Sequence, residues 1–271
     1  TEVPPPPPTE APKRVGECSF WGDPHIVTFD GARPSFYSEG EYYIAKSKDI
    51  DIQGRFMGTN YTEGLAATNK IAVGGAFLKY HVVTVGCLED GDIMIDGAPV
   101  LTTFPFSLDL ADVSATIRYD SEGTLVDAAN QAWERRIVHL DLPLGVSMTI
   151  MRWSNYVDFR LVMPQQPDQD GACGNFNDAA DDDTTAAIMS RLGFRVPDNQ
   201  MLFTKHAQIH LSSTESKLLQ MCDPERYSEA VEACRKEITE LLGDTAMQSC
   251  VLNNCFGSNE HVLKMAKGLG I

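Results

Sequence analysis

The sequence predicts a mainly β protein, an antiparallel β-sandwich followed by a C-terminal α-helical module stapled by disulfides. Between Cys18 and Val162, short segments rich in β-branched and aromatic residues alternate with Gly, Asp, Asn and Pro. This is the pattern of many short strands joined by turns. No long helical pattern separates these segments, so a parallel sheet is not expected. Beyond residue 220 the apolar residues recur every three or four positions, which is the period of a helix.

The strand pattern is clearest in segments that end at glycine, proline or acidic turns. The expected strands are 25–29, 41–45, 50–56, 77–85, 92–97, 115–119, 136–140, 146–153 and 156–162. His81 and His139 fall inside two of these segments, and we expect both to have structural roles.

The tail is predicted to contain two helices and a shorter third helical segment. Asp223-Pro224 marks a helix start, because proline fits the first turn. Gly243 marks a helix end. A second helix is expected to begin at Asp244 or Thr245 and to run to about Cys255, and residues 262–266 add a further turn or two.

Three regions are expected along the chain. Residues 1–16 include the run Pro4 to Pro8 and form a Pro-rich polyproline II linker, with an SH3-type ligand as the alternative. Residues 17–196 form the β-sandwich domain, and residues 197–271 form the cysteine-rich helical module. The chain begins with Thr1 rather than Met, so we expect a processed or excised piece of a longer protein.

The charge balance argues against two classes of partner. The 271 residues include 22 Lys and Arg against 38 Asp and Glu, a formal net charge of −16. Nucleic acid and anionic membranes repel such a surface. No stretch approaches eighteen consecutive apolar residues, so no membrane-spanning helix is expected.

The seven cysteines indicate disulfides in an oxidising compartment. Zinc sites usually draw on C-x-x-C pairs, and no such pair is present. Four cysteines lie in the tail, where three pairings are possible. A helical hairpin turning at Gly243 favours the pairs Cys234–Cys250 and Cys222–Cys255.

The stretch 170–183 concentrates oxygen ligands. It holds two asparagines and, after its cysteine, four aspartates. Calcium takes six to eight oxygens in a flexible geometry, and alternating Asn and Asp residues supply them. The same residue types favour turns, so an acidic turn without a metal is the alternative interpretation.

Two motifs that flank the β region resemble those of a known family. Residues 18–31, CSFWGDPHIVTFDG, resemble the opening C…GDPH-x-x-TFDG pattern of a von Willebrand factor type D domain. Residues 171–177, GACGNFN, are similar to the closing G-x-CGN-[FY]-[DN] signature of that family, about 150 residues later. The resemblance covers residues 17–195. Residues 250–255, CVLNNC, resemble the end of the cysteine-rich helical module that often follows such domains.

The resemblance implies a calcium site and a disulfide. In the family, the acidic loop joins the aspartate of the TFDG motif. The implied calcium ligands in this chain are Asp30, Asn175, Asn177, the Ala179 carbonyl, Asp182 and Asp183. A Cys18–Cys173 bridge would attach the first strand to this loop. Cys87 is then left over, either as a buried small residue or as an intermolecular link.

The chain departs from the family where multimerising members carry C-x-x-C, because Asp170 stands at the first cysteine position. Assembly by thiol exchange is therefore not expected. The GDPH motif is the one at which some members are cut between Asp and Pro. Here the Asp23 carboxyl would attack its own carbonyl, with the Pro24 nitrogen departing and His25 donating a proton. An intact turn is the alternative.

We expect a calcium-binding structural or adhesion module of a larger extracellular assembly, secreted or at the cell surface. Its expected partners are other domains of the parent chain, matrix or coat proteins, or further copies of itself. A module of a lipid-carrier or other ligand-binding protein is the alternative. Neither G-x-S-x-G nor H-E-x-x-H is present, so a conventional hydrolase is not expected. Asn60 begins an N-glycosylation sequon, which marks either a glycan or a chance occurrence.

Overall fold

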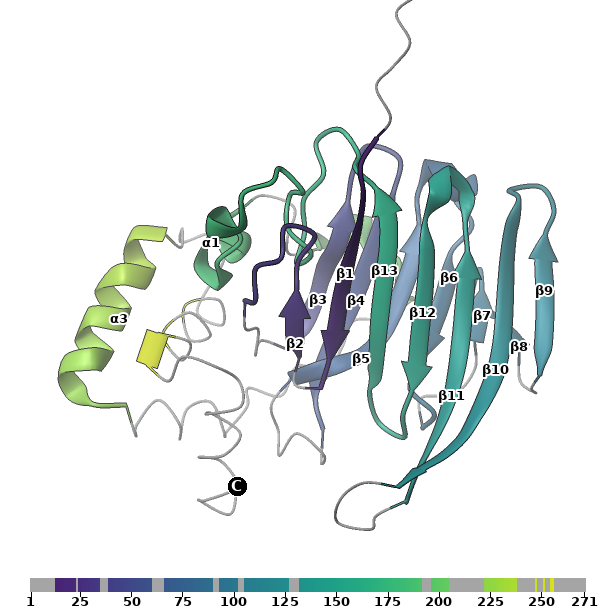
Figure 1. Cartoon of the computed structure of the whole chain (residues 1–271), viewed down its shortest axis with the longest axis horizontal. Helices are drawn as coiled ribbons and strands as arrows, with labels where there is room; N and C mark the ends of the chain where they lie inside the picture. The colour runs from purple at the N-terminus through teal and green to yellow at the C-terminus, as the bar shows by residue number, and fades with distance from the viewer. Residues whose placement is uncertain are drawn as a thin grey trace, which may run out of the picture.

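Two antiparallel sheets pack face to face in the structure, a computed structural model, which confirms the predicted β-sandwich (Figure 1). One sheet has seven strands in the order β2-β1-β13-β12-β11-β10-β9, and the other has six in the order β3 to β8. The structure describes residues 13–22, 24–34, 39–59, 66–89, 93–101, 105–126, 132–191, 196–204 and 222–237, together with 247, 251, 254 and 255.

The seven-stranded sheet draws its strands from the two ends and the middle of the domain. Its strands are β1 (Val15–Trp21), β2 (His25–Val27), β9 (Phe106–Leu110), β10 (Ala115–Val126), β11 (Ala132–Asp141), β12 (Ser147–Arg152) and β13 (Val157–Pro164). The pairing of β1 with β13 brings the opening of the domain beside its end, with Cys18 opposite Leu161.

The six-stranded sheet is a meander of consecutive strands. Its strands are β3 (Gly40–Lys46), β4 (Asp51–Gly58), β5 (Ala66–Gly74), β6 (Val83–Gly86), β7 (Ile93–Ile95) and β8 (Ala98–Leu101). The described helical segments are η1 (Ala76–Leu78), η2 (Pro143–Gly145), η3 (Ala180–Asp182), η4 (Asp198–Gln200), α1 (Thr185–Ser190) and α3 (Pro224–Glu237).

The core lies between the sheets and follows from the alternation of side chains along each strand. In β12, every second residue is buried, as the pleat of a half-buried strand requires. Phe20 of β1 stacks on Phe159 of β13 with 4.6 Å between ring centroids, and it meets Phe56 of β4 in the opposite sheet at 6.2 Å. Burial of each such side chain contributes about 1.5–3 kcal/mol to folding.

The strand predicted at residues 77–85 is wrong over most of its length. Residues Ala76–Leu78 form a 3-10 turn, and only Val83–Gly86 form β6. Lys79 and Tyr80 have φ angles of 49° and 67°, a left-handed backbone that a strand cannot contain.

Other strands of the structure have no counterpart among the predicted ones. Strand β5 is buried over nearly its whole length, so it lacks the alternation of polar and apolar residues that marks a half-buried strand. Strands β8 and β9 are also absent from the predicted set. Both lie at an edge of their sheet.

The first tail helix begins where proline predicted it. Helix α3 starts at Pro224, and the Asp223 carboxylate accepts hydrogen bonds from the backbone N–H groups of Glu225 and Arg226 at 3.0 and 3.2 Å. A Cys222–Cys255 disulfide joins the start of this helix to the end of the chain segment 247–255. The predicted helix end at Gly243 and the segment 262–266 lie outside the described residues.

Residues 196–204 lie along the six-stranded sheet. The Gln53 side chain of β4 donates to the Gln200 carbonyl and accepts from the Leu202 N–H, both at 2.8 Å. The Tyr43 hydroxyl of β3 donates to the Gln200 side-chain oxygen at 2.6 Å. The start of the helical module at residue 197 stays a prediction.

His81 joins a turn of one sheet to a turn of the other. His81 Nδ1 lies 2.7 Å from Asp96 Oδ2 in the β7–β8 turn, and His81 Nε2 lies 3.2 Å from Asp112 Oδ2 in the β9–β10 turn. Both ring nitrogens face carboxylate oxygens, so the imidazolium form, with two N–H donors, satisfies both contacts. The hydrogen bonds from Asp96 and then Asp112 raise the pKa of His81 above its ordinary value.

This contact makes stability depend on pH. A histidine whose folded-state pKa is raised stabilises the fold fully below its unfolded pKa near 6.5, and this contribution is lost as pH rises through the raised value. The substitution His81→Gln should therefore lower the urea midpoint at about pH 5.5 and leave it unchanged at about pH 9. His139→Gln, which removes a histidine that lies 3.4 Å from Asp120 of the same sheet, is the comparison for a contact that does not join the two sheets. Equal losses at both pH values would contradict a charged contact.

Candidate metal centre

The stretch 170–183 is attached to both sheets. It follows β13 and leads into α1 (Figure 1). The backbone N–H groups of Ala172 and Cys173 donate to the carbonyls of Tyr43 and Ile44 in β3, both at 2.9 Å. Cys173 is joined to Cys18 of β1, in the other sheet, by a disulfide that spans 155 residues. In the chain-entropy description, such a bridge contributes about 4 kcal/mol through the unfolded state.

Two glycines allow the loop to follow this path. Gly171 has φ 132°, and a Cβ there would lie 2.6 Å from the Ile44 carbonyl oxygen. Gly174 has φ 85°, and a Cβ there would lie 2.0 Å from Asp183 Oδ2. Both positions combine a backbone that disfavours side chains with no space for one. The glycines of the GACGNFN motif are therefore required by the shape of the loop.

An aromatic side chain anchors the middle of the loop. The Phe176 ring stacks on Phe29 with 5.0 Å between centroids. A Cβ on Gly16 of β1 would lie 2.5 Å from this ring, so β1 passes directly against it. The Phe176 carbonyl accepts hydrogen bonds from the side chains of Arg14 and Gln165, at 3.1 and 2.6 Å.

Asp30 reaches the acidic loop. Its two carboxylate oxygens accept the backbone N–H groups of Asn177 and Asp178, each at 2.9 Å. These bonds hold the turn at Asp178, whose φ is 73°. The structure thus brings Asp30 together with the loop, and its role as a metal ligand stays a prediction.

The side chains of the loop converge on Asp182. Its Oδ2 accepts the side-chain amides of Asn175 and Asn177 at 2.9 and 2.7 Å. The Asn177 side-chain oxygen accepts the Ala179 N–H at 2.8 Å. Four of the predicted ligands therefore lie within one hydrogen-bonded group.

Three buried oxygens of this loop have no hydrogen-bond partner among the described residues. They are Asn175 Oδ1, Asp182 Oδ1 and Asp183 Oδ2. Asp183 is fully buried. An unsatisfied buried acceptor costs about 1–3 kcal/mol, and a charged one costs more, so such a group requires an ion or another partner. Their oxygen chemistry fits a hard cation such as calcium.

The pKa values of Asp182 and Asp183 are shifted in opposite directions. Burial raises the pKa of Asp183, although hydrogen bonds from Thr28 and Arg191 oppose the rise. Burial also acts on Asp182, but the amides of Asn175 and Asn177 outweigh it and lower the pKa of that carboxyl. The amides therefore keep Asp182 ionised as a potential ligand.

The candidate centre is mixed in its ligand types. Within the described part of the chain, no group of three or more His, Cys, Asp or Glu side chains could hold a metal ion. The centre rests instead on two aspartates and an asparagine amide. Arg191 pairs with Asp170 and Asp183 and belongs to the same group. The sequence analysis missed it. Its one signal in the sequence is that it is the first basic residue after Asp181, Asp182 and Asp183.

The GDPH motif lies against a buried carboxylate of β13. The Gly22 N–H donates to Asp158 Oδ1 at 2.9 Å, and the Trp153 indole N–H donates to Asp158 Oδ2 at 2.7 Å. Burial raises the pKa of Asp158 to about 6, against both hydrogen bonds and the nearby His25. The His25 ring stacks on Trp21 at 5.6 Å. Asp23 lies outside the described residues.

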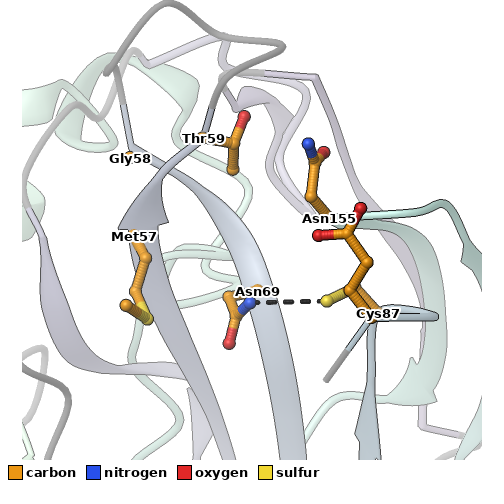
Figure 2. A pocket seen from close by; sticks show the side chains of 7 residues that line it. Met57, Gly58, Thr59, Asn69, Cys87 and Asn155 are labelled. Carbon is orange, nitrogen blue, oxygen red and sulfur yellow. Dashed lines mark hydrogen bonds between the residues drawn. The ribbon is translucent and has the colours of Figure 1, made fainter. Parts of the chain in front are cut away.

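Cys87 is a buried cysteine beside a cavity of about 300 Å³. Figure 2 shows the cavity between β4, β5 and the segment after β6, with Met57, Thr59 and Asn155 among its lining residues. The Asn69 amide donates to Cys87 Sγ at 3.5 Å. With an exposed fraction of 2%, this thiol is shielded from other chains.

The other predicted sites fall partly on undescribed residues. Cys222 and Cys255 are bonded to each other. Cys234 is also in a disulfide, but its expected partner Cys250 lies outside the described residues. The sequon residue Asn60 lies outside them as well.

Comparison with known proteins finds two similarities. A family model for the von Willebrand factor type D domain matches residues 18–188. The human IgGFc-binding protein is 24% identical over 194 residues, which cover 68% of this chain. The chain spans 3% of the length of that relative.

Alanine substitutions at Gly31 and Gly174, which have similar φ angles, should separate the cost of backbone strain from the cost of steric crowding. Gly31 has φ 84° with nothing within 4 Å of a built Cβ, whereas Gly174 has φ 85° with Asp183 at 2.0 Å. Gly31→Ala should lower the free energy of unfolding by about 1–2 kcal/mol. Gly174→Ala should lower it by about 3 kcal/mol or more, because Asp183 must also move. If urea unfolding shows the same loss of free energy for both variants, the position of Asp183 does not depend on the missing Cβ of Gly174.

Proposed function

The chain belongs to the von Willebrand factor type D domain family, and on that premise we propose that it is a calcium-binding structural and adhesion module of a larger extracellular protein. The observation that carries the proposal is the set of three unpartnered buried oxygens in a loop attached to both sheets. A cation bound there would lock the loop, and with it the two sheets, into one rigid unit.

The proposed ligands begin with the three unpartnered oxygens of Asn175, Asp182 and Asp183. Asn177 lies in the same hydrogen-bonded group and accepts the Ala179 N–H. Asn177 and the Ala179 carbonyl are proposed to complete the set, with Asp30 shaping the loop. When bound, calcium would supply positive charge and six to eight oxygen bonds. The chain itself orients the oxygens and excludes water through the buried position of Asp183.

An extracellular location is supported by the family and by the disulfides. Structural disulfides form and persist in oxidising compartments, and this chain has two bridges with both partners described. Among the described residues, no helix is long and apolar enough to cross a membrane. Other domains of the same longer protein and matrix or coat proteins are the proposed partners.

Assembly is proposed to proceed without thiol exchange. Asp170 stands where a C-x-x-C motif would begin, and its carboxylate is engaged by Arg191 at 2.7 Å. Cys87 is buried, with an exposed fraction of 2%. Contacts between folded surfaces are therefore the proposed basis of any self-association.

A second proposal is cleavage of the Asp23–Pro24 bond by the chain itself. The supporting observation is that Asp158 holds the backbone of Gly22, one residue before the bond, from within the core. In the proposed reaction the Asp23 carboxylate forms a bond to its own carbonyl carbon. The carbon–nitrogen bond to Pro24 breaks with proton donation to the nitrogen, and water opens the resulting anhydride.

Calcium binding can be tested with a matched pair of aspartates. By linkage, the melting temperature of the wild-type chain should rise with calcium and fall in excess chelator. Asp182→Asn should weaken the affinity measured by calorimetry by about tenfold or more, which corresponds to about 1.4 kcal/mol. Asp181→Asn removes an exposed neighbour of equal charge and should change the affinity by about twofold or less. Identical wild-type melting curves in calcium and in chelator would reject the proposal.

Self-cleavage can be tested by intact mass after incubation at about pH 5.5–6, near the raised pKa of Asp158. We expect a new N-terminus at Pro24 that is absent in Asp23→Ala. The two pieces should separate only after reduction, because Cys18 and Cys173 remain bonded. A single intact chain after prolonged incubation would exclude the reaction.

A further inference from the structure

One guanidinium group spans the acidic loop from its beginning to its end. Arg191 follows helix α1 and donates three hydrogen bonds. Its Nε reaches Asp170 Oδ1 at 2.7 Å, its Nη1 reaches the Asp182 carbonyl at 2.9 Å, and its Nη2 reaches Asp183 Oδ1 at 3.1 Å. The Arg191 side chain is only 20% exposed, so solvent screens these contacts less than it screens a surface ion pair.

The first contact anchors the guanidinium on the sandwich. The Asp170 carboxylate also accepts the Gly171 N–H at 2.8 Å, and the backbone of Asp170 pairs with Lys46 at the end of β3. A carboxylate fixed in this way holds the planar fork of the arginine in one orientation. Asp170 therefore attaches Arg191 to the six-stranded sheet.

The third contact gives the two oxygens of the Asp183 carboxylate different surroundings. Oδ1 accepts from Arg191, whereas Oδ2 has no hydrogen-bond partner in the described part of the chain and lies over the backbone of Gly174. Asp183 is 0% exposed, so water cannot readily satisfy Oδ2. Arg191 thus orients the carboxylate with one oxygen directed at itself and the other left for a cation.

The charges around Arg191 explain why a loop of this composition can fold before a metal arrives. Asp170, Asp182 and Asp183 lie close enough for Asp182 to act on both of the others, and Arg191 opposes this repulsion at all three. Without a positive charge, the packing of these carboxylates would be strongly unfavourable.

We propose that Arg191, anchored by Asp170, is a built-in cation that keeps the acidic loop folded in the absence of calcium. This inference rests on the proposed calcium function. When calcium binds, it neutralises the same carboxylates, so the contribution of Arg191 to stability is smaller in the loaded protein. The guanidinium and the metal therefore act as partial substitutes for each other.

The test is a thermodynamic cycle on the full chain. Wild type and Arg191→Gln are melted in excess calcium and in excess chelator. Arg191→Gln should lose more stability in chelator than in calcium, so the rise in melting temperature on adding calcium should exceed that of wild type by about 2–4 °C. An equal or smaller rise in the variant would overturn the proposal.

Two further variants keep the outcome interpretable. Arg160→Gln removes an arginine that pairs with Glu17 at 2.5 Å, away from the loop, and should leave the calcium-induced rise unchanged. Asp170→Asn removes the carboxylate that anchors Arg191 and should enlarge the rise in the same direction as Arg191→Gln. It replaces Arg191→Gln as the test if that variant does not fold.

The two proposals fail differently. If the melting temperature of the wild-type chain does not respond to calcium, the calcium function fails. If calcium raises the melting temperature of wild type, Arg191→Gln and Asp170→Asn by the same amount, only the proposed role of Arg191 fails.

Discussion

The structure depends on the attachment of residues 170–173 to both sheets at once. Backbone hydrogen bonds tie Ala172 and Cys173 to β3, and the disulfide ties Cys173 to Cys18 of β1. The two sheets otherwise meet mainly through apolar side chains, which are non-directional. These directional bonds therefore set how the sheets meet beside the acidic loop, and they place the loop oxygens before any ligand is present.

The acidic loop balances burial against charge. Asp183 is removed from water, which disfavours its ionised form. Donors to Asp183 from Thr28 and Arg191 offset this cost. The amides of Asn175 and Asn177 donate to the neighbouring Asp182 instead. Three oxygens of the loop are left without a hydrogen-bond partner among the described residues. On the proposed function, a cation would complete this site.

Sequence reasoning performs well where the local pattern and the tertiary environment agree. The short β-rich segments predict the sandwich, and Pro224 predicts the start of α3. It fails where a strand is buried on both faces, as in β5, or where left-handed residues such as Lys79 and Tyr80 interrupt a β-branched run. Arg191 and the contacts of His81 also escape prediction, because their partners are distant turns or loops without a spacing rule.

The sequence by itself determined the fold class and the composition of the loop, because hydrophobic periodicity and the GDPH and CGNFN motifs are local properties of the chain. Only the tertiary structure decided which oxygens of the loop are satisfied and which are left over. That outcome depends on donors from Thr28 and Arg191, and on the absence of a Cβ at Gly174. Hydrogen bonds between distant segments are set by the packing of the sheets, which no local pattern encodes.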